Sequence, residues 1–228
     1  MTLGLLYDVH GNVAALEAVL ADAAREGADR FVLGGDYALF GPRPEEALGR
    51  LRSLGADWIR GNGERWTAHP DDAPGDDVVQ GAVADLRELL GGDAVAELDG
   101  LPESLVRDGV RYVHASPVSD VRSFLPEPAD DEAELLASVG ETRLVFGHTH
   151  LPFRRQAEGG IELVNPGSVG MPFDGDPRAA YALVRDGSEL EHRRVEYDHE
   201  AAARDVRDRF GAWAETVSRR IASARFEP

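Results

Sequence analysis

The sequence contains no cysteine and no lysine among its 228 residues. Without cysteine, the chain can form no disulfide, no thiolate zinc site and no cysteine nucleophile. Without lysine, it can encode neither a Schiff-base enzyme nor a phosphate-binding loop that ends in Gly-Lys-Ser or Gly-Lys-Thr. All 24 basic side chains are arginines, so any phosphate that the protein handles must be held by other groups than lysine.

Basic charge and long apolar runs are also scarce. The 42 acidic side chains give a net charge of -18, which argues against nucleic acid or an anionic membrane as a partner bound by a basic face. The apolar run at residues 3–7 is too short for the core of a signal peptide, and no run approaches the roughly 20 apolar residues of a membrane span. We therefore expect a cytoplasmic protein in which an anionic substrate needs a local positive centre.

The pattern of short apolar runs alternating with amphipathic segments is typical of a sheet covered by helices, and 43% apolar residues suffice for a sizeable core. We predict strands over residues 3–7, 30–33, 57–59, 111–113, 143–146, 153–156, 161–164, 180–184 and 190–197. We predict helices over residues 13–25, 44–54, 78–90 and 198–226, with a mostly helical insert near 66–106 in a single domain of residues 1–228. The last four strands are expected to form a second, largely antiparallel sheet. The apolar face of the C-terminal helix is expected to pack on the body or on a partner chain, as in a homo-oligomer.

Potential metal ligands follow five of the predicted strands at the point where each strand ends. In chain order they are Asp8, His10, Asp36, Asn62, His114, His148 and His150. Because the ends of neighbouring strands in an open α/β sheet line one crevice, these side chains are expected to converge. The one-residue spacing within Asp8-Val9-His10 and His148-Thr149-His150 places both outer side chains on the same side of an extended chain. The sequence therefore predicts a single site.

The ligand set contains only oxygen and nitrogen donors, which suits Mn²⁺, Fe or Zn²⁺ with open positions for water. Seven ligands are too many for one ion to hold beside a substrate, so we expect two ions. A carboxylate can bridge ions roughly 3.5–4 Å apart, and Asp36 is the predicted bridge.

These motifs, in this order, resemble the calcineurin-like metallophosphoesterase superfamily, and in particular its small bacterial and archaeal members. The matching motifs are Asp8-Val9-His10, Gly35-Asp36, Gly61-Asn62, His114 and Gly147-His148-Thr149-His150, with Gly41-Pro42, His114-Ala115-Ser116-Pro117 and residues 165–170 as further shared segments. The resemblance runs from residue 3 to about residue 185. It implies an α/β fold of two facing mixed β-sheets flanked by helices in four layers.

The resemblance also implies a division of the ligands between two ions. One ion would be held by Asp8, His10, Asp36 and His150, and the other by Asp36, Asn62, His114 and His148. The ions, Mn²⁺ first with Fe, Zn²⁺ or Ni²⁺ as alternatives, would hold a bridging hydroxide that attacks phosphorus in line with the leaving group. Asp36, Asn62 and His114 would thus serve catalysis through metal ligation.

The expected activity is hydrolysis of a phosphodiester or phosphomonoester bond in a small phosphorylated substrate such as a nucleotide. A hydrolase of dinucleoside polyphosphates, of the diadenosine tetraphosphate type, is one alternative. A non-catalytic scaffold of the same fold that binds other proteins is another. All seven positions hold usable ligand types, which favours the enzyme.

One departure from the family pattern concerns the general acid. Many relatives have a histidine directly after the Gly-Asn motif, whereas Gly63 and Glu64 stand here. His69 is the one candidate to protonate the leaving group in its place. Arg65 and Arg122 are candidates for contacts to phosphate, with solvated surface roles as the competing interpretation.

We predict that without a dedicated acid the enzyme hydrolyses aryl esters far faster than alkyl esters of the same phosphate, and that His69→Ala leaves aryl rates unchanged. If His69 is the acid, His69→Ala slows alkyl esters roughly 10²–10⁴-fold and spares aryl esters. Rates for both ester types on both proteins separate these cases. A flat dependence on leaving-group pKa that survives in His69→Ala would contradict both.

Overall fold

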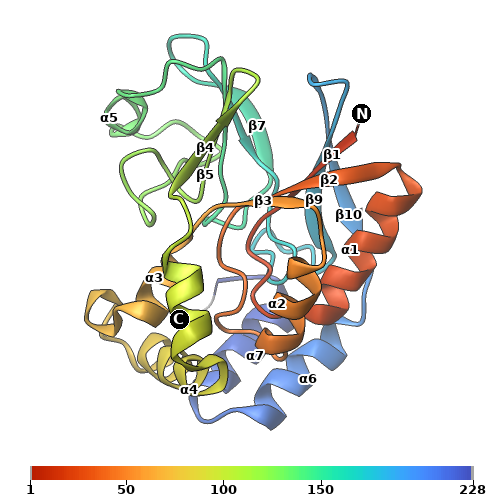
Figure 1. Ribbon diagram of the computed structural model, residues 1–228, viewed down its shortest axis with the longest axis vertical. Helices are drawn as coiled ribbons and strands as arrows, with labels where there is room; N and C mark the ends of the chain where they lie inside the picture. Colours follow the sequence, from red (N-terminus) through yellow and green to blue (C-terminus); the bar gives the residue numbers. More distant parts are fainter. Residues whose placement is uncertain (1, 227–228) are drawn as a thin grey trace.

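The computed structural model describes residues 2–226 and contains two five-stranded sheets that share a hydrophobic core (Figure 1). The first sheet has the order β10 (Glu189–Val195), β9 (Ala179–Arg185), β1 (Thr2–Leu6), β2 (Ala28–Leu33) and β3 (Ala56–Trp58). The second has the order β4 (Ser104–Arg107), β5 (Val110–Val113), β6 (Arg143–Val145), β8 (Glu162–Asn165) and β7 (Phe153–Gln156). Each sheet combines parallel and antiparallel pairs, so the predicted mixed sheets are confirmed.

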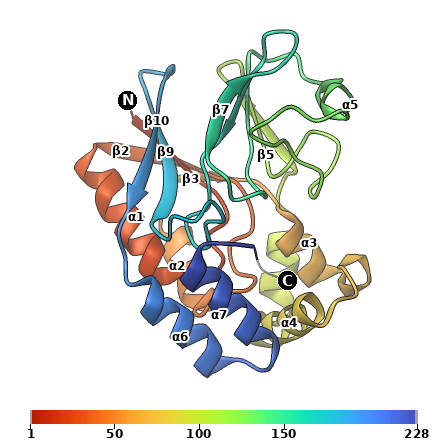
Figure 2. The same ribbon diagram turned by 180° about the vertical axis from the view of Figure 1, so that it is seen from behind.

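The helices lie mainly beside the first sheet (Figures 1 and 2). They are α1 (Val13–Arg25), α2 (Pro44–Arg52), α3 (Asn62–Ala68), α4 (Asp77–Asp99), α5 (Glu132–Leu136), α6 (His199–Arg209) and α7 (Trp213–Ser223), with a 3₁₀ turn at Pro70–Asp72. Figure 2 shows α1 along the first sheet, with α6 and α7 below it, and α5 by itself on the side of the second sheet. None of the helices within residues 2–226 has the combination of length and hydrophobicity that a bilayer span requires.

Three hydrophobic clusters separate the four layers of the fold. One joins the outer face of the first sheet to the helices, and a second lies between the sheets, where Leu5 and Val32 meet Val145. The third covers the outer face of the second sheet with Phe124 and with Leu135 of α5. Successive side chains of a strand point to opposite faces, so neighbouring residues of one strand enter different clusters. The four-layer arrangement implied by the resemblance is confirmed.

The predicted grouping of the last four strands into one separate sheet is wrong. β7 and β8 belong to the second sheet, whereas β9 pairs antiparallel with β1 and β10 pairs with β9 in the first. Every residue of β9 from 179 to 184 is buried, which suits an inner strand of a sheet covered on both faces. Hydrophobic periodicity identifies such a strand but does not specify its partner.

The predicted C-terminal helix over residues 198–226 is two helices, α6 and α7, that pack on each other. The break lies at Phe210, whose backbone is extended, and at the following Gly211. The turn brings the rings of Phe210 and Trp213 to 5.0 Å between centroids, and the Trp213 indole donates to Asp85 of α4 at 2.7 Å. The apolar face that includes Val217 is thus buried within the chain's own core.

The helical region before the second sheet also differs in detail. α4 begins near the predicted residue 78 but continues to Asp99 instead of ending at residue 90, with a break in helical geometry at Gly91. α3 and β4 are absent from the predicted elements. β4 alternates between exposed and half-buried residues and lies at the edge of its sheet, so it has no apolar run to mark it.

We predict opposite stability effects for alanine at two glycines. A Cβ at Gly41 would lie 1.4 Å from the carbonyl oxygen of His10, so Gly41→Ala must displace the loop and lower the free energy of unfolding by about 1–3 kcal/mol or more. Gly49 in α2 has open space there, so Gly49→Ala should raise the free energy of unfolding by up to about 1 kcal/mol. Urea denaturation measures both, and equal stabilities of the two variants would contradict this packing.

Candidate metal centre

The seven predicted ligands lie where strand ends of the two sheets meet. They are Asp8 and His10 after β1, Asp36 after β2, Asn62 at the start of α3, His114 after β5, and His148 and His150 after β6. β1 and β2 belong to the first sheet, and β5 and β6 belong to the second. The site therefore lies where two sheets meet, and the expectation that neighbouring strands of a single open sheet line it is wrong. Six of the seven form two groups, in each of which the ligand atoms lie within 4.8 Å of one another: Asp8, His10 and His150, and Asp36, His114 and His148.

Asp36 belongs to the second group and also faces the first. Its Oδ2 is 3.9 Å from Nε2 of His10 in the first group, and its Oδ1 is 3.6 Å from Nε2 of His114 in the second. Asn62 joins the second group, with its Oδ1 2.9 Å from Nε2 of His114. The two carboxylate oxygens of one side chain therefore face both halves of the site.

The backbone around the ligands is strained. Residues 2–226 contain nine non-glycine residues with positive φ, and five of them are predicted ligands: Asp8, His10, Asp36, His148 and His150. The expectation that the paired ligands project from extended chain is therefore wrong, because left-handed turns aim them inward. Each such residue costs on the order of 1–3 kcal/mol, and strain of this kind gathers at functional sites.

Burial sets the protonation of the ligands. It lowers the pKa of His10 to about 4 and that of His148 to about 3, and it lowers the pKa values of His114 and His150 as well. Burial also raises the pKa of Asp36 to about 7. The imidazoles are thus held neutral with free lone pairs, while the carboxylates lack a charge partner that a cation would supply.

Backbone carbonyls fix which nitrogen of each histidine faces the site. Nδ1 of His10 bonds the carbonyl of Leu39 at 2.8 Å, and Nδ1 of His150 bonds the carbonyl of Met171 at 2.6 Å. Because a carbonyl only accepts, Nδ1 carries the proton and Nε2 carries the lone pair. The two Nε2 atoms nevertheless lie 3.1 Å apart, so two acceptors face each other. A cation bound by both Nε2 atoms would remove the repulsion between their lone pairs. Histidine ligands of metals are commonly oriented in this way, by a hydrogen bond from the other ring nitrogen to a carbonyl.

Asn62 shows the same excess of acceptors in the second group. The inward Oδ1 faces the Nε2 of His114 at 2.9 Å, the Nδ1 of His148 at 2.8 Å and the carbonyl oxygen of Asp120 at 3.1 Å. Turning the amide over would place Nδ2 there as a donor and direct Oδ1 to the amide of Gly63 at 3.2 Å. With Oδ1 inward, the position suits a divalent ion. The donor set in both groups therefore fits metal.

Glu64 is a positioning residue that the motifs did not reveal. Its buried carboxylate accepts from the backbone amides of Asp36 at 2.9 Å, Tyr37 at 2.8 Å and Gly61 at 2.8 Å. Burial raises its pKa to about 7. These bonds join the loop that carries Asp36 to the start of α3, where Asn62 lies. A glutamate at the third position of a helix is half of a capping box, and that signal was available in the sequence.

Residues 165–170, one of the segments shared with the family, lie against the site. The Ser168 hydroxyl donates to the carbonyl of Asp8 at 2.7 Å, and the Asn165 amide donates to the carbonyl of Gly147 at 3.2 Å. Asn12 accepts from the amide of Ala15 at the start of α1 and donates to the carbonyl of Gly170 at 2.8 Å. The segment thus connects the two loops that carry four of the ligands.

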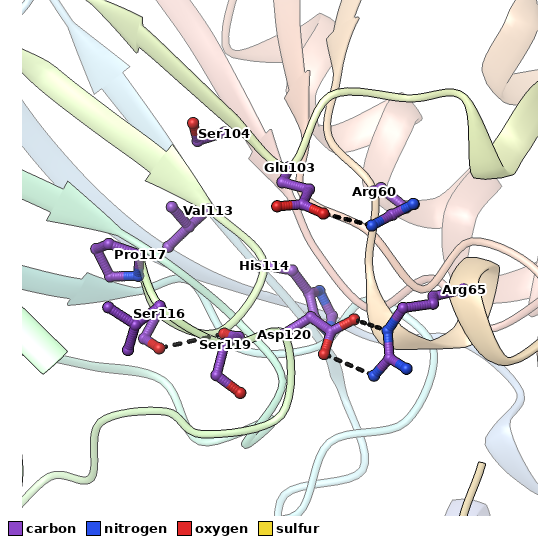
Figure 3. Close-up of a pocket in the computed structure, with 11 residues that line it drawn as sticks. Arg60, Arg65, Glu103, Ser104, Val113, His114, Ser116, Pro117, Ser119 and Asp120 are labelled. Atoms are coloured by element: carbon purple, nitrogen blue, oxygen red, sulfur yellow. Dashed lines mark hydrogen bonds and ion pairs between the residues drawn. The ribbon is translucent and has the colours of Figure 1, made fainter. Parts of the chain in front are cut away.

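Other polar candidates lie apart from the two ligand groups. His69 is half exposed, bonds Asp99 at 3.1 Å and does not line the cleft described below. A small cavity of about 270 Å³ lies beside His114. Figure 3 shows its lining residues, among which Arg65 is paired with Asp120 and Arg60 with Glu103. On the surface, Arg122 is paired with Asp131 and Glu134. The guanidinium forks of Arg65 and Arg122 are thus occupied by carboxylates.

A cleft of about 990 Å³ opens over both ligand groups. Its lining includes Asp36, Asn62 and three of the ligand histidines, together with apolar side chains. A substrate can therefore reach the proposed metal positions from this side.

Comparisons with known proteins agree with this geometry. The family model of the calcineurin-like phosphoesterase superfamily domain matches residues 1–187. A metallophosphoesterase of Sphaerobacter thermophilus has a crystal structure with a TM-score of 0.84 and 27% identity, covering 98% of this chain and 99% of its own. The uncharacterized protein MJ0912 of Methanocaldococcus jannaschii is 29% identical, covering 92% of this chain and 94% of its own length. The phosphodiesterase YfcE of Escherichia coli K12 is 28% identical, covering 81% of this chain and 87% of its own length.

We predict that Glu64→Gln weakens the binding of Mn²⁺ about 10- to 100-fold, as other losses of outer contacts to metal ligands do. The glutamine NH₂ cannot accept from a backbone amide, so at least one of the three bonds to Asp36, Tyr37 and Gly61 is lost. Glu88→Gln, the same change at an exposed site on α4, is the control. Titration calorimetry measures both, and equal Mn²⁺ affinities would show that Glu64 does not hold the centre in shape.

Proposed function

Because the chain belongs to the calcineurin-like phosphoesterase superfamily, we propose that it is a dinuclear, metal-dependent hydrolase of phosphodiester or phosphomonoester bonds. The observation that carries this proposal is the position of Asp36, whose two oxygens face His10 and His114 in separate ligand groups. The relative that is named as a phosphodiesterase supports a diester as substrate.

The proposed ligands divide as the two groups suggest. One ion is assigned to Asp8, His10, Asp36 and His150, and the other to Asp36, Asn62, His114 and His148. We propose Mn²⁺ as the ion because all donors are oxygen or nitrogen, with Fe, Zn²⁺ and Ni²⁺ as alternatives. Two divalent ions bound there would supply hydroxide near neutral pH and would offset the negative charge of the phosphoryl oxygens.

The protein's own contribution is to hold the donors ready. The carbonyls of Leu39 and Met171 fix the rings of His10 and His150, so little reorganisation is needed when an ion binds. Asp8 and Asp36 supply only two negative charges, so the loaded centre stays positive. This positive centre would attract a phosphoryl group even though the net charge of the chain is -18.

The surroundings of Gly63 support departure of the leaving group without a dedicated acid. A Cβ at position 63 would lie 2.9 Å from Oδ1 of Asp36, so a side chain has no room there unless Asp36 moves. His69 is bonded to Asp99 outside the cleft. Esters with a leaving group that carries negative charge well are thus the favoured substrates. The ligand set is complete, and all of its side chains are buried except the half-buried His148, which argues against a purely protein-binding scaffold.

The direct test is removal of metal. We predict that chelation abolishes hydrolysis of a chromogenic phosphodiester and that Mn²⁺ restores the activity better than Mg²⁺, because imidazole-rich sites bind Mg²⁺ poorly. Asp36→Asn, which removes one charge from the bridge, should lower metal content and reduce the rate by orders of magnitude. Asp29→Asn, at an exposed position of β2, should change neither.

Two results would contradict the proposal. One is full turnover in chelator after elemental analysis has shown that metal is lost. The other is an Asp36→Asn protein that retains two tightly bound ions and a near-normal rate.

A further inference from the structure

The cleft over the ligand groups has walls from four separate segments. α3, the start of α4, residues 121–131 and the C-terminal region all contribute to it. Arg220 and Phe226 lie beyond residue 187, where the match to the family model ends. The walls are thus built partly by residues that follow the part of the chain matched by the family model.

Apolar side chains are concentrated in these walls. Among residues 2–226, five large hydrophobic side chains are exposed, and three of them line this cleft: Val121, Leu125 and Phe226, with 41%, 47% and 66% of their surface exposed. Trp66 lines it as well, and its buried indole nitrogen has no hydrogen-bond partner among the described residues. Exposed apolar groups gathered around a cleft indicate a ligand with apolar surface.

An aromatic series leads outward from a metal ligand. Phe173 stacks on His150 with 4.4 Å between ring centroids and 16° between planes. Phe226 meets Phe173 edge to face at 5.4 Å, and the guanidinium of Arg220 lies 4.3 Å from the Phe226 ring centre. A flat ring attached to a phosphoryl group at the centre can pack along this series by stacking or edge contacts.

The charged side chains of the cleft beyond the ligands are mostly acidic. Asp76 and Asp77 line it at the start of α4, and Asp131 lines it from the segment that precedes α5. Asp131 is paired with Arg122, and Arg220 is the one arginine among the lining residues. A second or third phosphate in this cleft would therefore lie near like charge.

We propose that this cleft is a subsite for a flat aromatic group on a singly phosphorylated ester, and that its acidic residues disfavour substrates with further phosphates. The aromatic group is an aryl ring or a nucleobase, which share the chemistry that Phe173 and Phe226 recognise. The inference rests on the proposed function, since the metal centre must hold the phosphoryl group. If the inference holds, simple esters are favoured as substrates over dinucleoside polyphosphates.

The test measures binding of non-hydrolysable phosphonates to the Mn²⁺-loaded full chain by titration calorimetry. Phenylphosphonate should bind about 10- to 100-fold more tightly than methylphosphonate, because the ring buries apolar surface. Adding one negative charge to the ring, in 4-phosphonobenzoate, should weaken binding several-fold, and Asp77→Asn should reduce this loss. The phosphonate analogue of AMP identifies the source of the ring: tighter binding than phenylphosphonate indicates a nucleobase, and weaker or equal binding an aryl ester.

Variants locate the subsite. Phe226→Ala and Leu125→Ala should each reduce the preference for phenylphosphonate several-fold, whereas Val106→Ala, at an exposed position of β4 outside the cleft, should preserve it. Equal affinity for methyl- and phenylphosphonate, or a preference unchanged in both variants, overturns the inference. If methylphosphonate binds without a phenyl preference, only the subsite is wrong. If no phosphonate binds and no ester is hydrolysed, the proposed function fails and the subsite fails with it.

Discussion

The convergence of lone pairs in a buried space is the constraint on which the rest of the structure depends. The Nε2 atoms of His10 and His150 lie 3.1 Å apart, and the bonds from their Nδ1 atoms to backbone carbonyls leave a lone pair on each Nε2. Such an arrangement is unfavourable without a cation and is held by backbone carbonyls and left-handed turns. The packed core must therefore impose it. Residues of the ligand loops themselves, such as Val9 and Tyr37, are buried in the cluster beside the first sheet and hold these loops to it.

The meeting of two sheets explains why one site can collect ligands from so many segments. The first sheet supplies Asp8, His10 and Asp36 at the ends of β1 and β2. The second supplies His114, His148 and His150 at the ends of β5 and β6. Glu64 connects the Asp36 loop to α3, and residues 165–170 connect the loops of β1 and β6. Asp36 lies at the junction, so a change in the packing of the sheets would change the separation of the two ligand groups directly.

The sequence indicates all seven candidate ligands but only part of the fold. The ligands could be predicted because each follows an apolar run and because their order matches known motifs. The partners of β9 and the break at Phe210 could not be predicted, since they depend on contacts between distant segments, such as the pairing of β9 with β1 and the bond from Trp213 to Asp85. The left-handed backbone of Asp8 and His150 is likewise imposed by the fold, because isolated aspartate and histidine favour negative φ. Glu64 could have been found from its place at the third position of a helix, where a glutamate is typical of a capping box, but the metal-binding motifs do not include it.

The proposed function requires Asp36 to hold two ions together in one centre. Electron paramagnetic resonance of the full chain, loaded first with one and then with two equivalents of Mn²⁺, tests this claim most directly. A bridged pair predicts that the second equivalent converts the signal of isolated Mn²⁺ into that of an exchange-coupled pair with more closely spaced hyperfine lines. Two independent Mn²⁺ signals that simply add, or a chain that binds a single ion, would contradict the account.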